Sequence, residues 1–328
     1  MEKSRLDLKK PIEDSISKIR FAPNSNNLLI SSWDSILRLY DVDGSVMRFE
    51  AQSEGALLDC CFQDEFTALS AGSDGCVRRY DLCSNTQAIV GKHADSVIYV
   101  EYSEQTGQVI TAGLDKKLLF WDFHMKKGDA RSIKATDSEV WSISISGLHL
   151  LAAIGTEVVI YDLRNIEKPV QSKDFSKKYQ IWRVHPFTSC QGYAVGSIDG
   201  CVELKYYDPS EDSAMGYAFW CHPKSKDRSS HLVAVNDIKF HPFNKTFVTG
   251  DNEGHTIIWN AESRKRLFEI GRHPNSVASL AFNQGGQVLA VASSHTYQEA
   301  NEIEDVSQIF IHKWEDFALA CSSESYRD

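Results

Sequence analysis

The sequence predicts an all-β fold, a closed ring of seven four-stranded blades, and three observations support this. An aromatic residue followed by Asp or Asn ends six short apolar runs, at Tyr40-Asp41, Tyr80-Asp81, Trp121-Asp122, Tyr161-Asp162, Tyr207-Asp208 and Trp259-Asn260. These dipeptides recur at intervals of 40 to 52 residues, about the length of four strands with their turns. Turn triplets recur between the runs, at Ser73-Asp74-Gly75, Ile198-Asp199-Gly200 and Asn252-Glu253-Gly254. Together they are the signature of a WD-repeat β-propeller.

Each of the first three blades is expected to run from an innermost strand a to an outermost strand d, because short apolar runs alternate with turn residues. The first blade is predicted at Ser15–Phe21, Leu28–Ser32, Ile36–Asp41 and Val46–Ala51. The second is predicted at Ala56–Phe62, Phe66–Ala71, Cys76–Asp81 and Gln87–Val90. The third is predicted at Val97–Tyr102, Gln108–Ala112, Lys117–Asp122 and Ala130–Lys134.

The next three blades follow the same pattern, with a longer fifth blade. The fourth is predicted at Val140–Ser146, Leu150–Ile154, Glu157–Asp162 and Pro169–Asp174. The fifth is predicted at Tyr179–Phe187, Tyr193–Gly196, Val202–Tyr207 and Tyr217–Cys221. The sixth is predicted at Val235–His241, Thr246–Thr249, Thr256–Trp259 and Arg266–Ile270.

The seventh blade supplies only three strands of its own, at Val277–Phe282, Val288–Ala292 and Ile309–Lys313. A ring left open would expose unpaired strand edges, which promote aggregation. We therefore expect the N-terminal segment Arg5–Lys9 to pair as the missing outer strand and close the ring. The prediction is one propeller over residues 1–314 and a flexible C-terminal tail over 315–328.

Composition narrows the function classes. The 328 residues are 42% apolar and 24% charged, as in an ordinary globular protein, and the net charge is −10. Without a dense basic stripe, direct nucleic-acid binding is not expected. No apolar run approaches the ~18 residues that span a membrane, and no secretory signal is evident, so an intracellular protein is expected. The eight cysteines form no C-x-x-C pair, which argues against a zinc site.

Neither catalysis nor a cofactor is expected. His93, Thr111, Asp115 and Trp121 resemble a catalytic triad on paper, but in WD repeats these residue types form a buried hydrogen-bond chain within a blade. No nucleophile elbow, H-E-x-x-H motif or phosphate loop is present. Cys221-His222, His185 and His231 carry metal-binding side chains, but their spacing matches no common zinc site, so no metal site is expected there.

Four tryptophans are the candidate partner-binding residues: Trp33, Trp141, Trp182 and Trp220. Their places in the predicted blades put all four toward the face formed by the b–c and d–a loops, and aromatic residues often anchor protein interfaces. Packing between blades is the alternative for Trp141 and for Trp33. The long acidic b–c loop 295–308 is either a functional loop or a solvated one.

Several longer motifs resemble the Bub-type mitotic-checkpoint propeller, whose sister is the mRNA-export propeller that docks on a nucleoporin. The motifs cover nearly the whole chain. They include Ser31-Ser32-Trp33-Asp34, Leu37-Arg38-Leu39-Tyr40-Asp41-Val42, Gly55-Ala56-Leu57-Leu58-Asp59-Cys60, Lys178-Tyr179-Gln180, Gln191-Gly192-Tyr193, Tyr207-Asp208-Pro209-Ser210, Tyr217-Ala218-Phe219 and Ser276-Val277-Ala278-Ser279-Leu280-Ala281-Phe282.

The resemblance implies an adaptor without catalysis, whose top face holds a short acidic partner motif, the GLEBS motif, from checkpoint kinases or a nucleoporin. It also implies phosphothreonine binding in the checkpoint member. Both tasks need Arg or Lys. This chain departs from the pattern, since Trp182 follows Lys178-Tyr179-Gln180-Ile181 where the family has Arg, and Trp220 follows Tyr217-Ala218-Phe219 where the family has Lys or Arg. Arg183 cannot simply substitute, because a shift of one residue along a strand reverses the face.

The sequence is therefore interpreted as a divergent, monomeric checkpoint-type adaptor that binds a less acidic protein segment, in the nucleus and cytoplasm and at the kinetochore in mitosis. One alternative is a substrate receptor of a cullin-type ubiquitin ligase, docking through Asp162 and Arg164, because the run that ends there resembles the cullin-adaptor box of some propellers. Another is a nuclear-pore mRNA-export adaptor.

Overall fold

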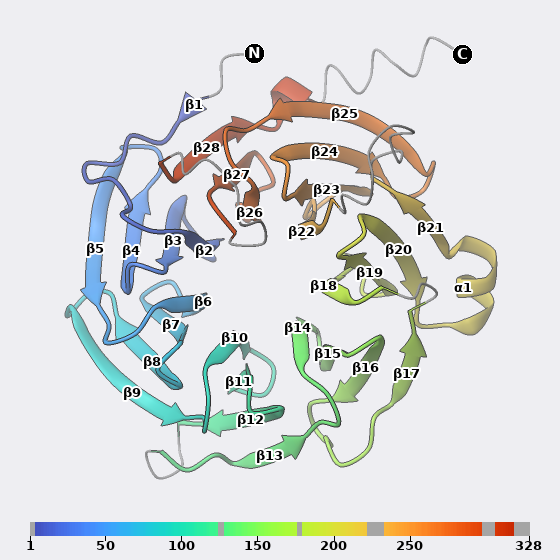
Figure 1. Ribbon diagram of the computed structural model, residues 1–328, viewed down its shortest axis with the longest axis horizontal. Helices are drawn as coiled ribbons and strands as arrows, with labels where there is room; N and C mark the ends of the chain where they lie inside the picture. Colours follow the sequence, from blue (N-terminus) through green and yellow to red (C-terminus); the bar gives the residue numbers. More distant parts are fainter. Residues whose placement is uncertain (1–3, 124–127, 176–178, 222–232, 297–305, 318–328) are drawn as a thin grey trace.

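Seven antiparallel sheets of four strands surround a common axis in the computed structural model (Figure 1). The structure describes residues 4–123, 128–175, 179–221, 233–296 and 306–317. The predicted all-β, seven-bladed propeller is thus confirmed. Across the described residues, no helix is long and apolar enough to cross a membrane.

The strand order in the first four blades is inner to outer along the chain. The first blade consists of β2 (Ile16–Phe21), β3 (Asn27–Ser32), β4 (Ile36–Asp41) and β5 (Val46–Gln52). The second consists of β6 (Leu57–Asp64), β7 (Thr67–Gly72), β8 (Cys76–Asp81) and β9 (Thr86–Lys92). The third consists of β10 (Val97–Ser103), β11 (Gln108–Gly113), β12 (Lys117–Asp122) and β13 (Ser132–Ala135). The fourth consists of β14 (Val140–Ser146), β15 (His149–Ile154), β16 (Glu157–Asp162) and β17 (Gln171–Asp174).

The last three blades complete the ring, and the seventh borrows its outer strand from the N-terminus. The fifth consists of β18 (Ile181–Pro186), β19 (Gly192–Ser197), β20 (Cys201–Tyr206) and β21 (Tyr217–Trp220). The sixth consists of β22 (Val235–Phe240), β23 (Thr246–Asp251), β24 (His255–Asn260) and β25 (Lys265–Arg272). The seventh consists of β26 (Val277–Phe282), β27 (Val288–Ser293), β28 (Gln308–Lys313) and β1 (Ser4–Arg5).

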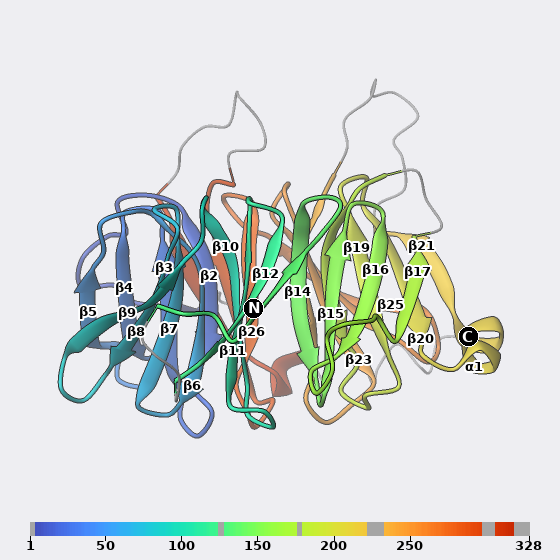
Figure 2. The ribbon, with the colours of Figure 1, turned by 90° about the horizontal axis from the view of Figure 1, so that it is seen from below.

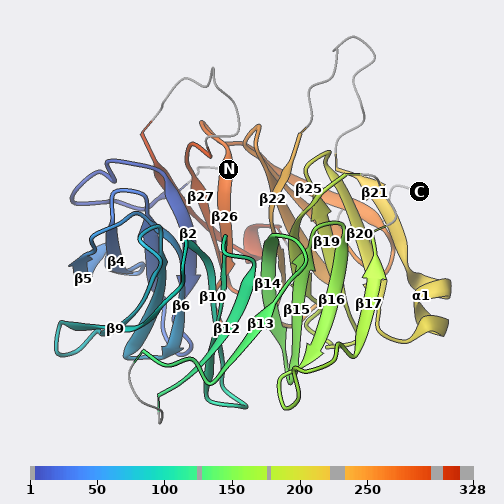
Figure 3. The ribbon, with the colours of Figure 1, turned by 60° about the horizontal axis from the view of Figure 1, so that its bottom comes forward.

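Two faces follow from this topology. We call the face formed by the b–c turns and d–a loops the top face, and the one formed by the a–b and c–d turns the bottom face. The side views in Figures 2 and 3 separate the two, with the ends of the strands gathered at either face. The innermost strands therefore run from the top face to the bottom face along a central channel.

Closure by the N-terminal strand is confirmed, with a shorter strand than predicted. Ser4 and Arg5 pair with Ile311 and Phe310, and the Leu6 amide donates to the Ile309 carbonyl at 2.9 Å. The predicted pairing segment Arg5–Lys9 is therefore wrong in its bounds, because the chain leaves the sheet after Leu6.

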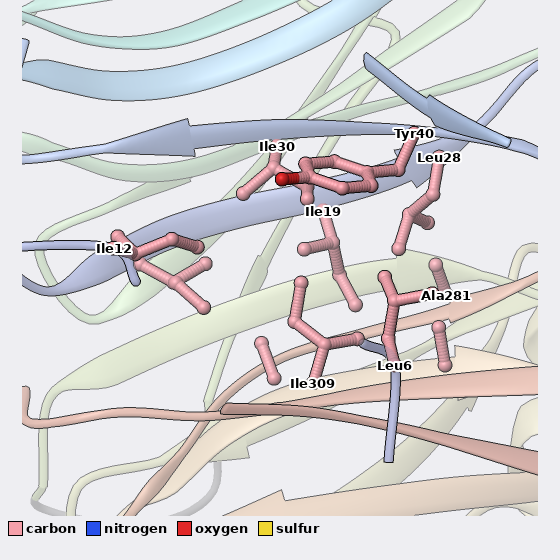
Figure 4. Close-up of a cluster of buried hydrophobic side chains, with 11 residues drawn as sticks. Leu6, Ile12, Ile19, Leu28, Ile30, Tyr40, Ala281 and Ile309 are labelled. Carbon is pink, nitrogen blue, oxygen red and sulfur yellow. The ribbon is translucent and has the colours of Figure 1, made fainter. Parts of the chain in front are cut away.

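Beyond the strand, Leu6 and Ile12 turn inward and pack with Ile19, Ala281 and Ile309 at the junction of the first and last blades (Figure 4). Leu6 is only 2% exposed and Ile12 only 3%. The N-terminal segment thus fills the junction with apolar side chains as well as pairing with β28, and both contributions stabilise closure.

A helix that the sequence analysis missed, α1 (Pro209–Met215), interrupts the fifth blade between β20 and β21. The Asp208 side chain caps its first turn by accepting from the amides of Ser210 and Glu211, and Pro209 stands at the first helical position. The predicted third strand therefore ends at Tyr206 rather than at Tyr207.

The predicted tail begins at Glu315, but the packed structure continues beyond that residue. Phe317 is 2% exposed and contacts Phe268 and Trp314, with ring centroids 5.7 and 5.8 Å away. The start of the tail at residue 315 is therefore placed too early. Residues 318–328, the rest of the predicted tail, lie outside the described residues.

The triad-like residues of the third blade form the predicted hydrogen-bond chain. His93 Nδ1 lies 3.0 Å from Asp115 Oδ1, and His93 Nε2 lies 2.8 Å from Thr111 Oγ1. The Trp121 indole N–H donates to the same Thr111 hydroxyl at 2.8 Å. Burial lowers the pKa of His93 although Asp115 opposes the shift. These hydrogen bonds tie β11, β12 and the turn between them to the loop that precedes β10, which is a structural role.

Candidate partner-binding face

Seven bulge residues surround the top mouth of the channel, one in each innermost strand. In every blade the pairing of strands a and b skips the second residue of strand a. A bulge leaves that residue outside the ladder and redirects its side chain. The skipped residues, which we call the mouth ring, are Ser17, Leu58, Ile98, Trp141, Trp182, Asn236 and Ala278.

The mouth ring is apolar on one side. Leu58, Ile98, Trp141 and Trp182, on four consecutive blades, are half-buried and so keep part of their surface at the mouth. Trp141 and Trp182 stack with centroids 5.7 Å apart and ring planes at 27°. Trp141 therefore packs against the neighbouring blade and still lies at the mouth of the channel. Both are possible because its packing partner, Trp182, is itself a mouth-ring residue.

Trp220 occupies the outer part of the same fifth blade. It is the last residue of β21, is 40% exposed, and pairs with Cys201 at the top of β20. Its indole N–H donates to Asp199 Oδ2 at 3.3 Å. An indole thus meets the Asp199 carboxylate at the position where the family pattern has Lys or Arg.

Trp33 lies apart from this group, in the b–c turn of the first blade, and is 42% exposed. Its amide donates to the Ser15 carbonyl at 2.8 Å, which fixes the turn. Next to it, Asp34 pairs with Arg38 at 2.6 Å. The structure thus brings Trp141 and Trp182 into contact, places Trp220 on the same blade as Trp182, and leaves Trp33 on another blade.

Arg183 does not replace the missing cations on the top face. Its Nη1 donates to the Tyr99 hydroxyl at 2.8 Å, its Nε donates to the Asn236 carbonyl, and its guanidinium lies 5.5 Å from the centre of the Tyr99 ring. These partners are in the third and sixth blades. Arg183 therefore spans the channel and ties three blades together, as the alternation of side chains along a strand predicts.

Below the mouth ring, the channel carries ion pairs that the sequence analysis did not identify. Lys18 Nζ lies 2.9 Å from Asp237 Oδ2, and Arg20 pairs with Glu101. Burial alone would raise the pKa of Asp237, but Lys18 and other nearby cations hold it far below its usual range. The sequence did contain a signal for these ion pairs. Polar residues two apart in strand a, such as Lys18 and Arg20, share one face of the strand.

One lysine of the channel is not paired. Lys239 makes no ion pair or hydrogen bond within the described part of the chain, unlike Lys18. Burial, and next the cations Arg20 and Lys18, lower the pKa of Lys239 to about 7. The channel therefore contains a group whose charge changes near neutral pH.

Asp162 and Arg164, the predicted cullin-adaptor docking residues, lie on the bottom face after β16. Arg164 Nη2 donates to Asp162 Oδ2 at 2.6 Å, and the Arg164 amide donates to Oδ1 at 2.9 Å. These bonds lower the pKa of Asp162 to about 2. Asp81 caps the corresponding turn of the second blade in the same way, with the amides of Cys83 and Ser84, so the Asp of the repeat has a structural role.

The predictions about a metal site and about the acidic loop involve some residues that the structure does not describe. Among the described residues, no group of three or more His, Cys, Asp and Glu side chains is arranged to hold a metal ion. His222 and His231, from the metal site considered above, lie outside the described residues, as do residues 297–305 of the acidic loop.

The fold and this face define a WD-repeat propeller. The family model "WD domain, G-beta repeat" matches residues 7–41 and 224–260. The chain is 46% identical over 314 residues to the mitotic checkpoint protein BUB3.3 of Arabidopsis thaliana, covering 95% of this chain and all of that protein. It is 36% identical over 310 residues to the mitotic checkpoint protein bub3 of Dictyostelium discoideum, covering 93% of each chain. It is 29% identical over 311 residues to the mRNA export factor GLE2 of Chaetomium thermophilum, covering 90% of this chain and 86% of that protein.

The chain belongs to the BUB3 family of mitotic checkpoint proteins. The resemblance of its motifs to the Bub-type checkpoint propeller is thus confirmed.

Proposed function

We propose that this protein is a non-catalytic adaptor of the spindle assembly checkpoint that acts at the kinetochore in mitosis and resides in the nucleus and cytoplasm. It binds a segment of a checkpoint kinase or kinetochore component on the top face, as a monomeric propeller. The relatives named as mitotic checkpoint proteins support the context. A rigid ring with functional loops on one face supports the adaptor role.

The observation that carries the top-face site is the Trp141–Trp182 stack at the channel mouth. Trp220 lies on the outer strand of the same fifth blade, and Trp33 lies on the first blade. Exposed aromatic side chains offer a large contact area with few rotatable bonds, and such residues dominate binding energies at interfaces. The site would bind a partner segment with less acidic character than the family's motif, because two cations are replaced by indoles.

The test is recruitment of the tagged full chain to kinetochores in cells arrested in mitosis. Trp141→Ala with Trp182→Ala should abolish recruitment, and Trp33→Ala should reduce it. Phe243→Ala is the matched control, since Phe243 is 74% exposed on the bottom face. Recruitment of the double variant at the wild-type level would show that the Trp pair is not the interface.

A second candidate is docking on a cullin adaptor through Asp162 and Arg164. The observation that favours it is the 66% exposure of the Arg164 side chain on the bottom face, although its guanidinium already pairs with Asp162. Co-purification of a cullin complex with the full chain, lost on Arg164→Ala, would support it. The export-adaptor alternative predicts instead enrichment at the nuclear rim, and the 29% identity to an mRNA export factor is its support.

A further inference from the structure

We propose that the top of the fifth blade binds a cationic side chain, Arg or Lys, in the partner segment. The site consists of Trp182, Asp199 and Trp220 of the fifth blade with Trp141 of the fourth, which stacks on Trp182, and we call it the blade-five strip. This inference rests on the proposed top-face function and specifies the chemistry of the partner. It reverses the charge preference that the family pattern implies.

The first argument is a carboxylate without a cation. Asp199, in the b–c turn of the fifth blade, is only 5% exposed. It accepts hydrogen bonds from the Ser197 hydroxyl and from the Trp220 indole N–H at 3.3 Å, and both donors are neutral. Among the described residues no cation pairs with it. A desolvated carboxylate is costly unless an opposite charge offsets it.

The first two blades pair the Asp of the equivalent turn with an arginine. In the b–c turns of the first two blades, Asp34 pairs with Arg38 and Asp74 pairs with Arg78, each Arg four residues further along. In the fifth blade the residue four positions after Asp199 is Glu203, which is itself paired with Lys205 at 3.1 Å. Among the described residues this turn therefore has no cation of its own, so the Asp199 carboxylate can pair with one that a partner segment supplies.

The second argument is the aromatic surface beside this carboxylate. The Trp220 ring is 40% exposed while its N–H is bonded to Asp199, so ring and carboxylate lie together. The Ile198 amide donates to the Gln180 carbonyl at 3.2 Å, which holds the turn against the start of strand a, where Trp182 stacks on Trp141. A cation over a tryptophan face is attracted by the ring quadrupole.

The charge of the surroundings agrees with this preference. The loop that leads into Trp141 carries Asp137, which is exposed, and Glu139, whose side chain is 39% exposed. Lys116 lies 3.4 Å from Glu139, so this pair is neutral and Asp137 adds a negative charge. The whole chain has a net charge of −10, which attracts cationic segments. Arginine suits the strip better than lysine, because its planar guanidinium stacks on indole and pairs with a carboxylate at once.

The test is a titration of the full chain followed by the indole N–H signals of its seven tryptophans in ¹⁵N NMR spectra. The probes are two blocked alanine pentapeptides that differ only in the central residue, arginine or glutamate. The arginine peptide should shift the Trp182 and Trp220 signals and bind about tenfold more tightly than the glutamate peptide. Asp199→Asn should weaken arginine binding by about tenfold, whereas Glu315→Gln, an exposed carboxylate on the bottom face, should leave it unchanged.

Should Asp199→Asn fail to fold, Trp220→Ala replaces it, because the Trp220 side chain is 40% exposed, and it should weaken arginine binding in the same way. Equal or tighter binding of the glutamate peptide, or no shift of either signal with the arginine peptide, would overturn the proposal. The adaptor function fails separately, if kinetochore recruitment survives Trp141→Ala with Trp182→Ala while the arginine peptide still binds the wild-type chain.

Discussion

The indole rings of Trp141 and Trp182 stack with centroids 5.7 Å apart across the boundary between the fourth and fifth blades. Both residues are the bulge residues of their innermost strands, so the same backbone irregularity presents them side by side. A double-mutant cycle with Trp141→Ala and Trp182→Ala should give a coupling in the free energy of unfolding of about 0.5–1.5 kcal/mol. Additive effects in urea unfolding would show that the rings do not stabilise each other.

Ring closure depends on the N-terminal segment. Deleting residues 1–10 removes β1 and the buried Leu6 side chain, and should lower the melting temperature of the whole domain in a single transition. Leu6→Ala alone should cost about 2–5 kcal/mol. Lys10→Ala is the control, because its pair with Glu50 is at the surface and contributes little. A truncated chain that melts at the parent temperature would contradict closure by β1.

The hydroxyl of Thr111 holds the hydrogen-bond chain of the third blade. Thr111→Val leaves His93 Nε2 and the Trp121 indole N–H without their shared partner, and should destabilise the fold by about 1–3 kcal/mol for each buried group. Thr86→Val makes the same chemical change at the exposed start of β9 and should have an effect within about 0.5 kcal/mol. Equal destabilisation by the two substitutions in thermal unfolding would show that the hydrogen-bond chain does not stabilise the fold.

The channel makes stability depend on pH near neutrality. The pKa of Lys239 is about 7 in the folded protein and near 10.4 when unfolded, so between these values the unfolded chain binds more protons and stability rises with pH. Below pH 7 Lys239 is charged in the folded and the unfolded chain, so the folded chain bears the full free-energy cost of this ammonium in the channel. Lys239→Met should therefore reduce the slope between pH 7 and 10 by up to about 1.4 kcal/mol per pH unit.

The comparison of wild type and variant isolates this group from the other titrations in the same range. The free energy of unfolding of both proteins is measured by chemical denaturation at intervals between pH 7 and 10. Parallel stability curves would mean that Lys239 keeps its ordinary pKa in the folded chain.

The ring and its closure were predictable because a repeat of strands with a fixed aromatic-Asp ending leaves few other folds, and an incomplete last blade needs a strand from elsewhere. The helix α1 was hidden, because Pro209 and the polar residues after it are equally typical of a turn. The bounds of β1 were missed because Leu6 and Ile12 serve the core rather than the sheet.

Contacts between distant parts of the chain were the least predictable. Lys18 and Asp237, which pair across the channel, are 219 residues apart. Local patterns identified the four tryptophans as candidates, but the stacking of Trp141 on Trp182 follows only from bulges in two neighbouring blades. The sequence marks Asp199 only as a turn residue, because its contrast with Asp34 and Asp74, which pair with arginines, emerges only among the described residues of the folded ring.

The central claim is that the top face no longer binds acidic segments, because indoles at Trp182 and Trp220 stand where the family has cations. The most direct measurement is calorimetric titration of the full chain with an acidic GLEBS peptide from a checkpoint kinase, beside the Trp182→Arg, Trp220→Lys double variant. The account predicts no binding by the wild type and binding gained by the variant. Micromolar or tighter binding by the wild type would contradict it, because the replaced cations would then be dispensable.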